Sequence, residues 1–191
     1  STVFKVSRTA SSVNVTVENI PVGDKAIINI ETPQDLCGNV TVKVDDKDYT
    51  VFVSGGKGTL VVPDLGVGPH TVNVTFDGCK KYEPSSNSTT FNVNKVKLDE
   101  NDIKIIDQGN GTVVVVVPNN ATGNVTITVD GKNFTAEVIN GTAVVNLDNV
   151  TPGTHEVEVI YSGDDTHNAT VTTANVTAPK YDSPFEVIIP E

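Results

Sequence analysis

An internal repeat constrains the fold of this chain more than any other feature of its sequence. Residues 38–50 read GNVTVKVDDKDYT, and residues 123–135, 85 positions later, read GNVTITVDGKNFT. A fixed period of this kind marks tandem copies of one structural unit. The chain has 191 residues, which is enough for two units of about 85–90 residues that each bury a core of their own.

The repeat predicts four segments along the chain. They are the remnant of a preceding repeat in 1–10, repeat 1 in 11–94, repeat 2 in 95–178, and the start of a following repeat or a tail in 179–191. Residues 2–6 (TVFKV) resemble residues 89–93 (TTFNV) at the end of repeat 1, so we assign them to a preceding unit and expect them to be loosely held. Because the chain starts with Ser1 and contains no stretch resembling a signal peptide, we interpret it as a fragment of a longer precursor.

The charge of the chain is strongly acidic and unevenly distributed. The formal net charge is −11. Residues 1–94 carry 8 Lys and Arg against 10 Asp and Glu, a net of −2, whereas residues 95–191 carry 5 against 14, a net of −9. Nucleic acids and anionic membranes attract clustered Lys and Arg. We therefore expect neither nucleic acid as a partner nor direct membrane insertion of this fragment.

Alternation with a period of two predicts β-strands throughout. Residues 13–17, 40–44 and 125–129 alternate β-branched with polar residues, as a strand with one buried face does. Turn signals such as Asn-Gly and Asp-Gly recur every 8–12 residues, and many short strands at this spacing indicate an antiparallel sandwich or barrel. The expected strands lie near 12–18, 25–31, 38–45, 48–54, 58–62, 70–77 and 88–94, and near 102–106, 111–117, 123–130, 132–138, 141–147, 154–162 and 169–177.

The same alternation predicts which side chains of the strands face the core, and the repeat predicts how the two units align. We expect alternate residues of 40–44 and 125–129 to point inward, and Lys43 and Thr128 to point outward, because a slip by one residue would bury a charge. The apolar run 113–117 is expected to be a central strand. Matching Gly58 with Gly141 also predicts that neighbouring turns differ slightly in length between the repeats.

Several motifs resemble one family. Gly-Asn-Val-Thr, Val-Asp-Gly-Lys, Thr-Pro-Gly-Thr and the segment 161–165 (YSGDD) resemble the bacterial immunoglobulin-like (Big) repeats, as found in adhesin-like surface proteins of methanogenic archaea. The resemblance covers most of repeat 2 and, less faithfully, repeat 1, where Asp46 replaces the hairpin glycine. It implies an all-β chain of two tandem immunoglobulin-like antiparallel β-sandwiches, located extracellularly at the cell surface or wall.

The sequence offers no catalytic motif. His70 and His155 occupy matching positions just after a turn, which favours a role in opening a strand. No nucleophile elbow, zinc-spaced Cys/His set or phosphate-binding loop is present. We therefore predict no enzymatic activity, no catalytic or metal-binding residues and no cofactor. Because Ca²⁺ takes six to eight oxygens, we interpret the aspartates of two loops as solvated turns; they are Asp45, Asp46 and Asp48, and Asp77, Asp164 and Asp165.

Aromatic residues are not gathered into a sugar-stacking platform. Tyr49 matches Phe134 and Phe76 matches Tyr161, so these four are expected in the core or at its edge. Phe52 matches Glu137, which indicates an outward face, and Phe91 matches Ala174, which suggests an isolated exposed ring of the ordinary kind.

Cys37 and Cys79 are predicted to form a disulfide within repeat 1. In a sandwich of this topology the third and sixth strands are antiparallel neighbours. Cys37 precedes the third strand and Cys79 follows the sixth, so they meet at one end of the sheet. The matching residues of repeat 2, Thr122 and Asp164, cannot form a bridge, and two free thiols are the alternative in repeat 1.

The motif Asn-x-Ser/Thr occurs at 12 of the 19 asparagines. Strands rich in Val, Thr and Asn produce such motifs by chance, and they accept glycans only in a secretory setting. We nevertheless predict that some carry glycan in the native organism. The candidates are Asn14, Asn39, Asn73, Asn87, Asn110, Asn120, Asn124, Asn133, Asn140, Asn149, Asn168 and Asn175.

Three functions are compatible with these features. The first is an adhesin-like fragment that extends and presents binding regions at the cell surface and contributes to cell adhesion. The second is a module that binds carbohydrate or wall polymer, and the third is a purely structural stalk or surface-layer element. Expected partners are another cell surface, a protein or a polysaccharide, together with adjacent repeats of the same parent chain. Sandwiches host many functions, so this choice follows from the resemblance.

Overall fold

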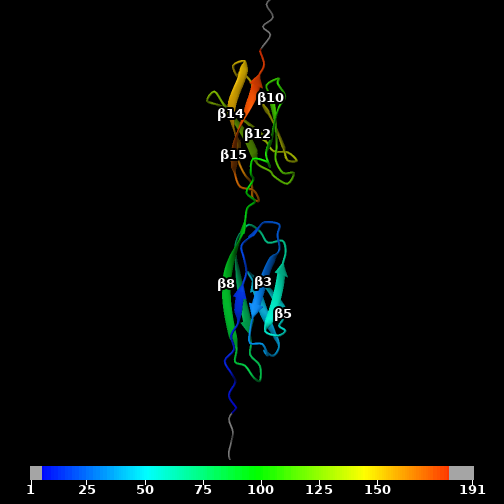
Figure 1. The fold of residues 1–191 in the computed structure, drawn as a ribbon, viewed down its shortest axis with the longest axis vertical. Helices are drawn as coiled ribbons and strands as arrows, with labels where there is room; N and C mark the ends of the chain where they lie inside the picture. Colours follow the sequence, from blue (N-terminus) through cyan, green and yellow to red (C-terminus); the bar gives the residue numbers. More distant parts are fainter. Residues whose placement is uncertain (1–5, 181–191) are drawn as a thin grey trace, which may run out of the picture. The chain divides into compact units, whose positions relative to one another are not determined.

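The computed structural model describes residues 6–180. The chain divides into two compact units between Lys95 and Val96, one residue after the boundary expected from the repeat. Within the described residues, every regular element is a β-strand, and each unit is an immunoglobulin-like β-sandwich (Figure 1).

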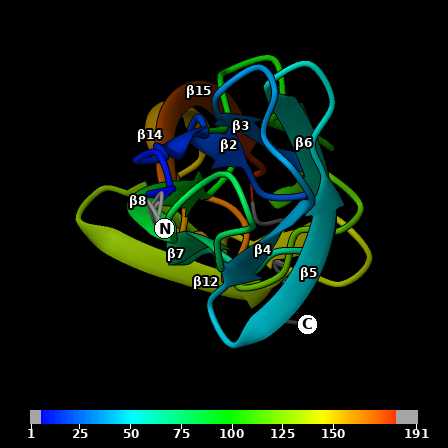
Figure 2. The same cartoon turned by 90° about the horizontal axis from the view of Figure 1, so that it is seen from below.

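Unit 1 consists of two sheets that enclose one core. The first has the strand order β1-β3-β6, and the second has the order β2-β8-β7-β4-β5. In Figure 2, β3 and β6 lie across the core from β7 and β4. All pairings between these strands are antiparallel except that of β2 with β8. The strands are β1 (Asn14–Thr16), β2 (Ile20–Pro21), β3 (Ala26–Glu31), β4 (Asn39–Val44), β5 (Lys47–Phe52), β6 (Lys57–Val62), β7 (Gly68–Phe76) and β8 (Ser85–Asn94).

Unit 2 repeats this arrangement with one strand fewer. Its sheets have the orders β9-β10-β13 and β12-β11-β14-β15, and all of their pairings are antiparallel. The seven strands expected from the sequence are all present, each within about three residues of its expected ends. They are β9 (Lys104–Asp107), β10 (Thr112–Val116), β11 (Asn124–Val129), β12 (Lys132–Glu137), β13 (Thr142–Asn146), β14 (Gly153–Tyr161) and β15 (Thr170–Ala178).

The predicted facing of the strands is confirmed. In β4, Lys43 is exposed while its neighbours on the alternate positions are buried, and β11 follows the same pattern with Thr128 on the outer face. The apolar run 113–117 lies largely in β10, between β9 and β13, as a central strand should. The inward residues are Val40, Val42, Val44, Val125, Ile127 and Val129, all at most 3% exposed.

The two units keep a constant spacing of 85 residues from β3 onward. Glu31 pairs with Lys57 in unit 1, and Val116 pairs with Thr142 in unit 2. The match of Gly58 with Gly141 was therefore wrong. Gly141 corresponds to Gly56: the amides of Thr32 and Val117 donate to the carbonyls of Gly56 and Gly141 respectively, at 2.9 Å in each unit. The turns near Gly55 and Gly66 have not changed length between the units.

The real length difference lies before β3. Asn14 pairs with Glu31, and Lys104 pairs with Val116, so β1 and β9 are offset by 90 residues instead of 85. Unit 1 thus contains five extra residues between its first strand and β3. These residues hold β2, which the sequence did not predict because two residues are too few to show a period.

The start of unit 1 also requires a correction. The amide of Thr9 donates to the carbonyl of Lys81 at 2.8 Å, and the amide of Glu83 donates to Thr9 at 2.8 Å. Val96 makes the equivalent parallel contact with the loop before β15. Thr9 therefore belongs to repeat 1 and not to the remnant of a preceding one. The prediction that residues 2–6 are loosely held cannot be compared with the structure, because of these residues only the exposed Val6 is described. The part of the predicted tail beyond Lys180 also lies outside the described residues.

Candidate functional sites

The predicted disulfide closes one end of unit 1. Cys37 and Cys79 are bonded, with their Cα atoms 6.4 Å apart, a separation that a disulfide readily spans. The bridge joins the segment just before β4 to the segment just after β7, and these two strands are antiparallel neighbours. Beside it, the hydroxyl of Tyr82 donates to Asp35 at 2.5 Å and the ammonium of Lys81 is paired with the same carboxylate. The hydrogen bond from Lys81 and, to a smaller extent, the hydrogen bond from Tyr82 lower the pKa of Asp35.

The same end of unit 2 uses hydrogen bonds instead of a disulfide. Asp164, which matches Cys79, accepts hydrogen bonds from the backbone amides of Thr122 at 2.7 Å, of Thr166 at 2.7 Å and of His167 at 2.6 Å. The hydroxyl of Tyr161 donates to it at 3.1 Å. The side chain of Asp164 is only 7% exposed. Our interpretation of Asp164 as a solvated turn was therefore wrong, although Asp77 and Asp165 are exposed.

The hydrogen bonds around Asp164 decide its ionisation. Burial by itself raises the pKa of this carboxyl group, but the amides of Thr122, Thr166 and His167 stabilise its charged form, so that the net pKa is well below its usual range. Burial and the neighbouring carboxylate raise the pKa of the Tyr161 phenol. Two oxygens that accept this many hydrogen bonds are committed to structure and have little capacity left for a ligand.

We expect Asp164→Ala to destabilise unit 2 by about 3 kcal/mol, because it leaves several buried donors without an acceptor. Hydrogen exchange of the β11 and β14 amides should report this loss, whereas β4 and β7 of unit 1 should be unchanged. Asp165→Ala, next to it but exposed, is the matched control. Because the pKa of Asp164 is lowered on folding, its stabilisation is present above about pH 4 and should decline as the pH falls further. Equal exchange in both variants would contradict this role.

An aspartate–histidine pair occurs at the other end of both units. In unit 1, the Nδ1 of His70 lies 2.7 Å from Asp45 Oδ2, and its Nε2 lies 2.7 Å from the carbonyl of Gly66. In unit 2, His155 makes the same contacts with Asp130 at 3.3 Å and with the carbonyl of Thr151 at 2.7 Å. Both histidines are the third residue of their strand, so they do open a strand, and each also links it to the preceding hairpin.

The pair in unit 1 should make its stability depend on pH. Burial lowers the pKa of His70, but the bonds to Asp45 and Gly66 outweigh it, so the net pKa is raised. The stabilisation is therefore complete below about pH 6.5 and is lost as the pH rises through the raised value. Because Asp45 is partly exposed, we expect a loss below about 1 kcal/mol between pH 6 and 9. Hydrogen exchange of the β7 amides, with rates corrected for pH, should show this loss of stability. The substitution His70→Gln should abolish the pH dependence.

The aromatic residues are placed as predicted, with one exception. Phe76 and Tyr161 are buried, Tyr49 and Phe134 pack at the core edge, and Phe52 is 74% exposed. Phe91, however, is only 2% exposed.

The prediction that Phe91 is exposed was wrong because it relied on the matching alanine of unit 2. Phe91 pairs with His70 in register and stacks on its ring, with centroids 5.4 Å apart.

All twelve asparagines of the glycosylation motif are exposed, so each offers its amide to solvent or to a transferase. Asn87 is also structural, because its side-chain amide donates to the carbonyl of Val13 at 2.9 Å. Glycan occupancy stays a prediction, which mass spectrometry of protein secreted by the native organism would test.

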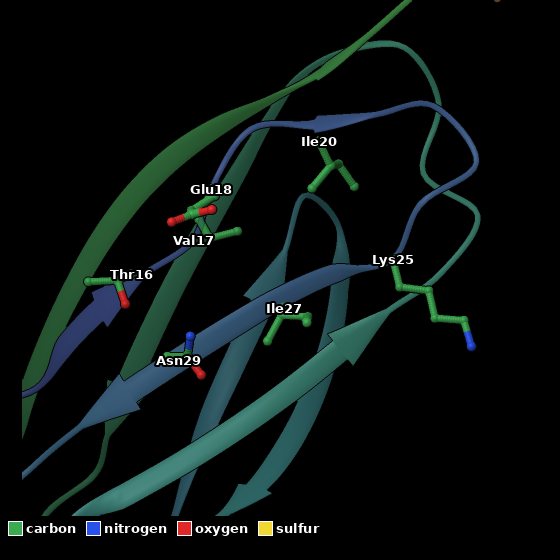
Figure 3. A pocket seen from close by; sticks show the side chains of 7 residues that line it. All are labelled: Thr16, Val17, Glu18, Ile20, Lys25, Ile27 and Asn29. Atoms are coloured by element: carbon green, nitrogen blue, oxygen red, sulfur yellow. The ribbon is translucent and has the colours of Figure 1, made fainter. Parts of the chain in front are cut away.

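A shallow groove of about 320 Å³ lies on unit 1 at the five-residue insertion. Figure 3 shows Val17, Glu18 and Ile20 on the segment that passes from β1 to β2, facing Ile27 and Asn29 on β3. The groove has a mixed lining and no aromatic residue; the lining residues are the aliphatic Val17, Ile20 and Ile27 and the polar or charged Thr16, Glu18, Lys25 and Asn29. Stacking on a sugar ring is therefore not available there.

Within residues 6–180, no three or more His, Cys, Asp or Glu side chains are grouped so as to hold a metal ion. No helix in this part of the chain is long and apolar enough to cross a membrane.

Comparison with known proteins supports the sandwich fold. Residues 102–178, nearly all of unit 2, match the family model of the bacterial Ig-like domain (group 3). No curated protein gave a significant match.

Solved structures with similar folds are distant. SGBP-B of the Bacteroides ovatus mixed-linkage glucan utilization locus, in complex with a mixed-linkage heptasaccharide, is 16% identical, with a TM-score of 0.33 over 84% of this chain and 42% of its own. The BSP domain of a biofilm associated protein is 17% identical, with a TM-score of 0.31 over 90% and 30%. Titin A168–A169 is 13% identical, with a TM-score of 0.39 over 89% and 99%. This chain spans less than half of the first two, and none of these scores supports an argument about function.

Proposed function

We propose that this chain is part of an extracellular, wall-associated adhesin-type protein. In that protein it extends the parent and presents its binding regions, and so contributes to adhesion to another cell or to a polymer. The observation that carries the proposal is the tandem of two sandwiches, which keep one 85-residue frame from β3 to β8 and from β10 to β15. Units repeated with so little change are suited to adding length.

Two further observations support a location outside the cell. Cys37 and Cys79 are bonded, and stable disulfides belong to oxidising compartments. The glycosylation motifs are dense and lie on exposed residues. The role we propose is not enzymatic: Asp164, the most strongly perturbed carboxylate, has its oxygens committed to hydrogen bonds within the fold.

Surface display would test the presenting role. A small binding domain of known ligand is fused to a cell-wall anchor through unit 2 alone, through both units, or through a short flexible linker, at equal surface density. Capture of ligand-coated beads should increase from the linker to unit 2 and again to both units, because longer spacers carry the binding domain beyond the wall polymers. Equal capture by all three would contradict the proposal.

The same chain, immobilised without the added domain, distinguishes the other functions. Specific binding to a glycan array would favour a carbohydrate-binding module. Absence of binding together with equal capture in the display experiment would favour a purely structural element. The proposal expects no glycan binding and a graded capture.

A further inference from the structure

The outer edge of β15 in unit 2 lacks the short strand that covers the end of the matching strand in unit 1. β15 is the last strand of the sheet β12-β11-β14-β15 (Figure 1). Its nine residues, TVTTANVTA, include no charge, no proline and no glycine. Proteins usually protect such an edge with charges, proline, a bulge or a covering segment, because its unpaired amides and carbonyls are a template for another strand.

In unit 1 the chain itself covers the C-terminal end of the corresponding edge of β8. β2 pairs with the end of β8. The amide of Val22 donates to the carbonyl of Asn94 at 2.8 Å, and the amide of Asn92 donates to the side chain of Asn19 at 2.7 Å. The five-residue insertion of unit 1 supplies this cover, and unit 2 does not have it.

Among the described residues of unit 2, one hydrogen bond from β9 reaches β15, and it shows which way the edge faces. The amide of Thr177 donates to Asp107 Oδ2 at 2.8 Å, so it points away from β14. Backbone direction alternates along a strand, and the amides of Val171, Thr173 and Asn175 therefore point the same way. Within residues 6–180, no hydrogen bond from another element reaches these three amides.

The side chains around this edge are apolar or neutral on β15 and acidic on β14. Val171 is 59% exposed on the outer face. In register with Thr173 and Asn175, the neighbouring β14 presents Glu158 and Glu156, both exposed. The matching residues of unit 1 are Asn73 and Thr71, which are neutral. Among the described residues, the matching stretch of β8 (Ser86, Ser88 and Thr90) also has no partner strand on its outer side. The feature that distinguishes unit 2 is therefore an open edge beside an acidic flank.

We infer that β15 is a docking edge for an extended polypeptide segment that carries Lys or Arg at alternate positions. The segment adds a strand beside β15, pairing with the amides of Val171, Thr173 and Asn175. Its basic side chains lie on the outer face, where long side chains reach Glu156 and Glu158. A second copy of this chain fits less well, because residues 95–191 carry a net charge of −9. This inference goes beyond the presenting role proposed above and does not depend on it.

Synthetic peptides test strand addition directly. The probe is a blocked heptapeptide, Lys-Val-Lys-Thr-Lys-Val-Lys, and the control is the same peptide N-methylated at alternate residues, which keeps its charge but removes the hydrogen bonds of one edge. In ¹⁵N spectra of the full chain, the probe should shift amides of β15 and β14 and leave β8 unchanged. The N-methylated peptide should bind at least about tenfold more weakly.

Protein variants separate backbone pairing from charge. Thr173→Pro removes one outward amide and should abolish binding, while Ser88→Pro, its match in unit 1, should leave binding intact. Glu156→Gln with Glu158→Gln should weaken binding about tenfold at low salt, whereas Glu137→Gln on β12 should not. Equal binding of both peptides, shifts away from β15, dimerisation of the chain through β15, or a Kd above about 1 mM would overturn the inference. If Thr173→Pro does not fold, the N-methylated peptide alone decides.

Discussion

Val42→Asp should unfold unit 1 and leave unit 2 folded. Val42 lies in the middle of β4, paired with Tyr49 of β5 on one side and Val74 of β7 on the other, and it is 0% exposed. The substitution removes about 2 kcal/mol of stabilisation from buried apolar surface and places an unpaired charge in the core. We therefore expect the free energy of unfolding of unit 1 to fall by more than about 5 kcal/mol. This approaches the whole stability of an ordinary domain.

Hydrogen exchange followed by mass spectrometry resolves the two units separately. Amides of β4, β7 and β8 should lose protection in Val42→Asp, while those of β11 and β14 should keep it, because each unit has a core of its own. Thr41→Asp is the matched control: Thr41 is adjacent on β4 but exposed, so it should cost less than about 1 kcal/mol. If the two variants exchange alike, the assignment of the inward face is wrong.

The elements that the sequence predicted well are those whose signal is local. The inward positions of β4 and β11 follow from alternation alone, since a strand has only two faces. The disulfide followed from topology: once the third and sixth strands were taken as neighbours, Cys37 and Cys79 had to meet at one end. The repeat added a check, because the strands of unit 2 had to match those of unit 1.

The features that the sequence missed depend on tertiary contacts. The amides of Thr166 and His167 that bond Asp164 lie in its own loop, but the amide of Thr122, which also bonds it, is 42 residues away, and no local pattern indicates that contact. Phe91 was assigned from its match Ala174, yet it lies on the inward face of β8 in the core of unit 1, where it also stacks on His70. β2 exists because an insertion lets the chain cross to the edge of β8. In the sequence, this insertion shows only indirectly, because the two repeats match from β3 onward and not before it.

Removal of the disulfide should destabilise unit 1 by about 4 kcal/mol, because the bridge closes a loop of about 43 residues and restricts the unfolded chain. Cys37→Ala with Cys79→Ala should show this loss in hydrogen exchange of β4 and β7. Unit 2 is the internal control, since Thr122 and Asp164 already perform the same closure there by hydrogen bonds. Intact mass should rise by about 2 Da when the native protein is reduced under denaturing conditions, as one S–S bond becomes two thiols. An unchanged mass would mean that the thiols are free in solution.

The disulfide should also make the two units respond differently to force. When the chain is pulled from its ends, tension passes through the sulfur atoms, and the 41 residues between Cys37 and Cys79, whose separation is 42, remain unextended. At roughly 3.5 Å per residue, unit 1 should lengthen by about 140 Å less than unit 2 when it unfolds. Single-molecule extension of the oxidised chain should therefore give two step sizes, and reduction should make them nearly equal. Equal steps before reduction would show that the bridge does not carry the load, and a presenting role under tension would then depend on the hydrogen-bonded sheets alone.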